Sequence, residues 1–114
     1  MSEETGYEID GGTLFIRIKG DLDHHMAEGI REEADRLIDA YGVRHVVFDF
    51  SKSGFMDSSG IGVIMGRYQK LHYAGGSVSV AGIGGRLEKV FQLSGLNRIV
   101  GRYEEAKMGG KGRR

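Results

Sequence analysis

The feature that most constrains this fold is a repeated change in the spacing of apolar residues along the chain. In the segment Thr13–Lys19 every second residue is leucine or isoleucine, which predicts a strand with one apolar face. In the segment Met26–Tyr41 the apolar residues recur three or four positions apart, which predicts an amphipathic helix. Strand and helix patterns continue to alternate after this point, and such alternation predicts an α/β fold with parallel strands.

The remaining elements follow from the same patterns and from the glycines between them. We expect Gly11-Gly12 to join a strand at Tyr7–Asp10 to the strand at Thr13–Lys19 in a tight hairpin. Asp23 suits the N-cap of the first helix, and Gly42 suits its end. The other expected elements are strands at His45–Phe50 and Ser77–Ala81, a helix through Ile61–Leu71 that stops at Gly75-Gly76, a helix through Leu87–Ser94 capped by Gly95, a short last strand or sheet edge in Leu96–Val100, and a helical turn or two in Tyr103–Met108.

The chain has 114 residues, which is enough for one domain with one modest core. We therefore expect a single α/β domain over residues 1–108. Its small mixed sheet has four to five strands, with the N-terminal hairpin followed by parallel strand–helix units, and it carries three to four helices. The last six residues, GGKGRR, have nothing to bury, so residues 109–114 are expected to form a basic flexible tail.

Composition excludes several classes of function. Lysine and arginine total 16, as do aspartate and glutamate, so no general attraction to nucleic acid or to an anionic membrane is expected. The chain contains no cysteine, which excludes disulfides and thiolate chemistry. The acidic N-terminus does not resemble a secretory signal, and no apolar run approaches the ~20 residues of a membrane-spanning helix. These observations indicate a cytoplasmic protein.

Two motifs suggest metal or phosphate binding but lack the rest of the required pattern. Asp23-His24-His25 could supply metal ligands, yet adjacent histidines seldom reach one ion, and a metallohydrolase needs several more converging ligands. We expect an ordinary helix start there, and no metal. The turn Gly82–Arg86 joins a strand to a helix but lacks both the Walker and the dinucleotide fingerprints. It is interpreted as a permissive turn, with a weak nucleotide site as the alternative.

The segment FMDSSGIGVIMGRYQ, from Phe55 to Gln69, holds three glycines within a predicted helix. Glycine costs a helix up to ~1 kcal/mol relative to alanine, so Gly60, Gly62 and Gly66 need a reason. Close packing on the sheet would explain some of them. A surface left bare for a partner would explain the others, and the sequence alone does not divide the three.

Ser58 has three possible roles. A catalytic nucleophile needs an activating base, and the segment lacks the G-x-S-x-G elbow. An N-cap is equally consistent with Asp57, Ser58 or Ser59. A hydroxyl at a loop–helix junction is also accessible to a kinase, so Ser58 could cap the helix and accept phosphate.

The same segment resembles the central motif of the anti-sigma factor antagonists of the STAS-domain family. The DSSG-x-G pattern carries the resemblance, and GDLDHHMAE at Gly20–Glu28 and RHVVFDF resemble further landmarks of the sporulation branch. The similarity covers roughly Tyr7 to Val100. Met26, which stands where the relatives have threonine, the glycine-rich turn at Gly82–Arg86 and the basic tail depart from the family pattern.

The resemblance implies a regulatory cycle rather than an enzyme. The unphosphorylated protein would bind an anti-sigma factor that is also a serine kinase, and so release the sporulation sigma factor F. Phosphorylation of Ser58 would end that binding, and a phosphoserine phosphatase would restore it. No cofactor is implied, and the free protein is expected to be monomeric. The residues implied to contact the partner are Asp23, His24, Met56, Asp57, Ser58, Ser59, Gly60, Ile61 and Gly62.

Two alternatives remain open at this point. One is a stress-response antagonist of the same family with a different kinase, and the other is a small nucleotide-binding or hydrolytic protein.

Overall fold

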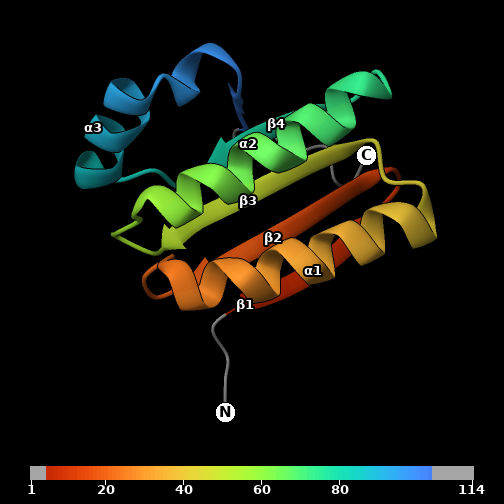
Figure 1. Cartoon of the computed structure of the whole chain (residues 1–114), viewed down its shortest axis with the longest axis horizontal. Coiled ribbons are helices and arrows are strands. Elements are labelled where there is room, and N and C mark those ends of the chain that lie inside the picture. Colours follow the sequence, from red (N-terminus) through yellow and green to blue (C-terminus); the bar gives the residue numbers. More distant parts are fainter. Residues whose placement is uncertain (1–4, 104–114) are drawn as a thin grey trace.

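The structure is a computed structural model that describes residues 5–103. A five-stranded sheet forms its centre, and two long helices lie side by side across one face of the sheet (Figure 1). The elements are, in chain order, β1 (Thr5–Asp10), β2 (Thr13–Lys19), α1 (His24–Tyr41), β3 (His45–Lys52), α2 (Ser58–Tyr73), β4 (Ser77–Ala81), α3 (Gly85–Ser94), a 3-10 turn (Leu96–Arg98) and β5 (Gly101–Arg102).

The strand order follows the chain, β1-β2-β3-β4-β5. Strands β1 and β2 pair antiparallel through the hairpin, whereas β2, β3, β4 and β5 pair parallel. Thr13 pairs with His45, and His45 pairs with Ser77, so three parallel strands begin in register. The loops that follow β2, β3 and β4 therefore all emerge at one edge of the sheet, which is where open α/β sheets commonly bind ligands.

The core lies between the sheet and the helices α1 and α2, and it includes buried side chains of α3 and the 3-10 turn. The alternation predicted for Thr13–Lys19 is confirmed, because the leucine and the two isoleucines of β2 are completely buried. Strand β3 is more continuously buried, as its composition predicts for a strand covered on both faces. The largest fully buried side chains are Phe48, Phe50, Phe91, Leu14, Ile16, Ile18, Leu22, Ile30, Ile64, Leu71, Leu87 and Leu96.

The predicted start and end of α1 and the predicted end of α3 are also confirmed. Helix α2 ends at Tyr73 with Ala74 as its C-cap, just before the predicted Gly75-Gly76. Asp23 is the N-cap of α1, and Gly42 ends that helix in the left-handed conformation, with φ of 63°. Gly95 ends α3 in the same way, with φ of 84°. At such a position glycine avoids the steric penalty that a Cβ atom would introduce.

The prediction for the C-terminal segment was wrong in one place. The segment Leu96–Val100 was expected to form a strand or a sheet edge, but Leu96–Arg98 forms a 3-10 turn and the last strand is Gly101–Arg102. The turn follows directly from Gly95 and buries Leu96, so local turn geometry overrides the strand propensity of the next residues. The helix expected in Tyr103–Met108 and the tail at 109–114 lie, apart from Tyr103, outside the described residues.

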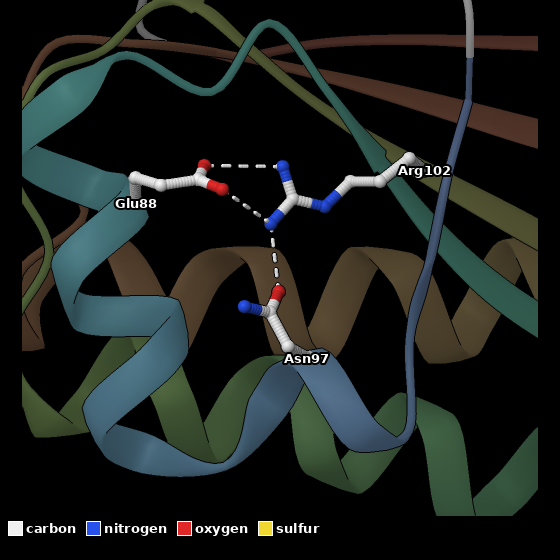
Figure 2. A network of polar contacts seen from close by, with 3 residues as sticks. All are labelled: Glu88, Asn97 and Arg102. Carbon is white, nitrogen blue, oxygen red and sulfur yellow. Dashed lines mark hydrogen bonds and ion pairs between the residues drawn. The ribbon is translucent and has the colours of Figure 1, made fainter.

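Arg102 connects this short last strand to α3. Figure 2 shows its guanidinium between the carboxylate of Glu88 and the side-chain oxygen of Asn97. Both nitrogen–oxygen distances to Glu88 are 3.2 Å, and the distance to Asn97 Oδ1 is 2.7 Å. The guanidinium also lies 5.7 Å from the centre of the Phe91 ring. A two-residue strand has few ladder hydrogen bonds, so this forked contact supplies side-chain support that the backbone lacks.

Candidate functional site

Two loops at the carboxyl edge of the sheet are joined by backbone hydrogen bonds. The Leu22 amide, in the loop after β2, donates to the Phe55 carbonyl at 2.9 Å, and the Asp57 amide donates to the Leu22 carbonyl at 3.3 Å. Leu22 also forms an isolated parallel bridge with Met56. The structure therefore holds Asp23 and Ser58, which are 35 positions apart, on two adjoining loops.

Each loop ends in an aspartate that caps the next helix. Asp23 Oδ1 accepts a hydrogen bond from the Met26 amide at 3.1 Å at the start of α1. Asp57 Oδ1 accepts one from the Ser59 amide at 2.8 Å at the start of α2. The sequence allowed Asp57, Ser58 or Ser59 as the N-cap of α2, and in the structure the N-cap is Asp57. Ser58 is consequently the first residue of α2, and it is exposed.

A side-chain contact also bridges the first turns of the two helices. Ser59 Oγ lies 3.4 Å from His24 Nδ1. His24 contributes to the electrostatics of the next turn of α1 as well: the pKa of Glu28 lies below its ordinary value, chiefly because Arg31 donates a hydrogen bond to it and also because His24 is near. Ser58 therefore lies at the positive end of α2, between the capping Asp57 and Ser59, whose hydroxyl contacts the His24 imidazole.

The three glycines of α2 divide into two kinds. A Cβ atom at Gly60 would lie 2.7 Å from Met56 Cγ and 2.9 Å from Leu22 Cγ, so a side chain there would displace the joined loops. At Gly62 and Gly66 a Cβ atom would meet nothing within 4 Å. Close packing thus explains Gly60 alone. The other two leave helix backbone bare on the outer face of α2.

The glycine-rich turn before α3 reaches the same edge of the sheet. Gly82 has φ of 70°, and a Cβ atom there would lie 2.6 Å from the Ser51 amide nitrogen at the end of β3. The backbone can approach β3 this closely only without a side chain. Packing therefore accounts for Gly82, and the prediction of a permissive turn at Gly82–Arg86 is consistent with this geometry.

The residues implied to contact a partner are brought together, but they do not all reach the surface. Asp23, His24, Ser58 and Gly62 are exposed, and Asp57, Ser59 and Ile61 are partly exposed. Met56, at 3% exposure, is buried together with Gly60, so these two residues pack beneath the loops and are not accessible to a partner.

Phe55 is a member of this surface that the sequence analysis did not single out. Its side chain is 43% exposed beside the bridge between the loops. The sequence signal that could have identified Phe55 is its position: it is an aromatic residue outside any strand or helix pattern, two positions before the capping Asp57. An exposed aromatic side chain offers a partner a large apolar contact.

The described residues contain neither a group of potential metal ligands nor a helix suited to span a membrane. Within residues 5–103, no three histidine, aspartate or glutamate side chains are grouped so that they could hold a metal ion. Of the helices in that range, none is both long and apolar enough to cross a membrane.

Comparison with known proteins gives concordant results. Residues 6–108 match the STAS domain family model. The chain is 36% identical to the anti-sigma F factor antagonist of Paenibacillus polymyxa over 91% of this chain and 89% of that protein. The fold is similar to that of the anti-sigma factor antagonist SpoIIAA in its unphosphorylated form, with a TM-score of 0.77 and 28% identity over 96% of each chain. It is also similar to the phosphorylated form of the Bacillus cell fate determinant SpoIIAA, with a TM-score of 0.75 and 31% identity over 94% of this chain and 97% of that one.

Proposed function

This chain belongs to the STAS-domain family, and from that membership we propose that it is an anti-sigma F factor antagonist switched by phosphorylation of Ser58. In its unphosphorylated form it binds an anti-sigma factor, which is also its serine kinase, and sigma factor F is released. The protein acts as binding partner and phosphate acceptor, not as an enzyme. The observation that carries the proposal is the exposed Ser58 at the first position of α2, next to the loop that holds Asp23 and His24.

The proposed contact surface consists of the two joined loops and the first turns of α1 and α2. Asp23, His24, Ser58 and Gly62 contact the anti-sigma factor directly, with Asp57, Ser59 and Ile61 at the edges of the contact. Met56 and Gly60 act indirectly, because they are buried and set the distance between the loops.

Phosphorylation can end binding without unfolding the antagonist. A phosphoryl group adds about −1.5 to −2 charges at neutral pH. At Ser58 it lies at the amino end of α2, where the free amides and the helix dipole stabilise negative charge, and the exposed site lets water solvate it. Against a partner, the same group would lose much of that water beside Asp57 and would face acidic or apolar groups on the partner's own surface. Like-charge contacts across an interface cost several kcal/mol.

The rest of the cycle is part of the same proposal. A phosphoserine phosphatase restores the binding form. The protein works in the cytoplasm and is monomeric when free. It needs no cofactor of its own, because the kinase supplies the ATP.

The test is a kinase reaction with site mapping. The protein is incubated with ATP and a cognate anti-sigma F factor kinase, and the phosphate is located by mass spectrometry. We expect one phosphate, on Ser58. Ser58→Ala should accept none, and Ser59→Ala is the matched control that should still accept it.

The outcomes separate this proposal from its alternatives. Phosphate on Ser59 alone, or undiminished incorporation into Ser58→Ala, would show that the assignment of the acceptor is wrong. A parallel reaction with an anti-sigma B kinase tests the stress-response alternative, which predicts faster phosphorylation by that enzyme. Nucleotide turnover by the isolated protein would contradict a regulatory role.

A further inference from the structure

Arg67 is the only buried charged residue in the described core, and nothing proposed so far uses it. It lies in the third turn of α2, and its side chain is 9% exposed. Its Nε atom is 3.0 Å from Oδ1 of Asp35, in the middle of α1. Burial, ahead of any neighbouring charge, lowers the pKa of Arg67 from its usual value, and Arg31 acts in the same direction.

The contact between Arg67 and Asp35 is not optimised for stability. The two atoms form an ion pair at 3.0 Å, but their alignment does not meet the geometry of a hydrogen bond, and the buried Arg67 Nη1 also has no hydrogen-bond partner among the described residues. Buried polar groups that lack hydrogen bonds are costly. A buried ion pair of this kind can often be replaced by apolar residues of similar volume with no loss of stability, and its best-attested role is to fix how two elements align.

The position of the pair between the two helices gives that role a physical meaning. Three polar side-chain contacts join α1 to α2 along their length: His24–Ser59 in the first turns, Asp35–Arg67 in the middle and Asp39–Lys70 near the carboxyl ends. The middle contact is the more buried of the two ion pairs, since Arg67 and Asp35 are 9% and 32% exposed, whereas Lys70 and Asp39 are 35% and 68% exposed. The buried Arg67 side chain has little water to replace Asp35 as its partner, so this contact resists sliding of one helix along the other.

We propose that Arg67 is a positioning residue, whose ion pair with Asp35 sets the axial register of α2 against α1 and thereby places Ser58 relative to Asp23 and His24 for the kinase. The inference rests on the function proposed above, and it adds a distant residue to that site. Ser58 begins α2, and Asp23 caps α1, so a shift of one helix along the other moves the phosphate acceptor relative to its recognition loop. Because the kinase is proposed to contact both loops at once, such a shift weakens its binding of the substrate surface, which raises KM rather than lowering kcat.

The test removes both charges at once and compares two pairs of positions. Arg67→Met combined with Asp35→Leu replaces the buried pair by apolar side chains of similar size. Lys70→Met combined with Asp39→Leu is the matched control, because it removes an ion pair between the same two helices at an exposed place. Unfolding curves, kinase KM and kcat, and backbone amide chemical shifts are measured for both double variants and for the unaltered protein.

We expect the buried-pair variant to unfold at nearly the same denaturant concentration as the unaltered protein. Its KM with the kinase should rise about tenfold or more, with kcat changed less than about twofold, and the amides of Asp23–Met26 and Ser58–Ile61 should shift. The exposed-pair control should leave KM and those amides unchanged. An unchanged KM in the folded buried-pair variant, with amide shifts confined to the neighbours of Arg67 and Asp35, would overturn the proposal.

Two further arms keep the result decisive. If the buried-pair variant does not fold, Arg67→Gln is used instead, since Asp35 is 32% exposed and remains partly hydrated; an unchanged KM in this folded variant also overturns the proposal. If the unaltered protein is not phosphorylated on Ser58, the proposed function fails. The amide shifts then still decide whether Arg67 sets the register of the two helices.

Discussion

Gly60 and Gly62 lie two residues apart in the same helix and face opposite environments. A methyl group at Gly60 would collide with Leu22 and Met56, whereas one at Gly62 would meet open space. The inner face of α2 is therefore fixed by packing on the joined loops. The outer face is free of internal constraint, and yet it carries residues that weaken a helix.

This difference indicates which constraint acts on each face. A residue that a fold needs should be costly to change in the free protein. A residue kept for a partner should be cheap, or even favourable, to change in the free protein and costly only in the complex. Substitutions on the two faces of α2 can therefore be ranked by whether they affect stability or binding.

The largest effect is expected on binding, from a change at the exposed start of the helix. Ser58→Asp places a permanent negative charge where the phosphate is proposed to lie. Affinity for the anti-sigma factor, measured by calorimetry, should fall about a hundredfold, which corresponds to roughly 3 kcal/mol. Stability should not fall, because an acidic residue in the first turn of a helix is favourable by about 0.3–1 kcal/mol.

The control for this variant is Ser58→Ala, which removes the hydroxyl without adding charge and should bind far better than Ser58→Asp. Circular dichroism and unfolding curves accompany both. Loss of helical structure in Ser58→Asp would contradict the view that the switch works by local repulsion at the interface.

The next effect is expected on stability, from the packed face. Gly60→Ala adds a methyl group 2.7 Å from Met56 Cγ. Overpacking of this kind costs about 1–3 kcal/mol, and the better helix propensity of alanine returns up to ~1 kcal/mol. The free energy of unfolding, from denaturant titration, should therefore fall by about 1–2 kcal/mol. A variant as stable as the unaltered protein would show that the loops move aside without cost.

The contrast between the two glycines also shows what the sequence could predict. Periodicity located β2, β4 and the three helices, because a buried face imposes its period on the residues that form it. Residue type predicted the caps Asp23 and Gly42, because helix capping depends mainly on residues that are neighbours in the chain. It could not divide Gly60 from Gly62, since the groups that decide between them, Leu22 and Met56, are brought there by the fold.

The same limit applies to the rest of the site. From the sequence, Asp23 and Ser58 could be placed on adjoining loops only on the condition that β2 pairs parallel with β3, as it does in the structure. Arg67 could not be recognised as buried, since it occupies the flank of α2 that α1 covers. The 3-10 turn at Leu96–Arg98 was missed because a short apolar segment suits a strand equally well.

The smallest effect is expected at Gly62, and it should have opposite signs in the free protein and in the complex. Gly62→Ala adds a methyl group in open space on an exposed helix face, so the free energy of unfolding should rise by up to about 1 kcal/mol. Affinity for the anti-sigma factor should fall, by less than about tenfold, because the partner is proposed to approach the bare backbone. Gly29→Ala is the matched control: Gly29 is also exposed with open space around it, but it lies in the second turn of α1 and is not among the proposed contact residues, so the substitution should raise stability without weakening binding. Equal affinities for the two alanine variants would mean that Gly62 is not part of the contact, and the outer face of α2 would then need another explanation.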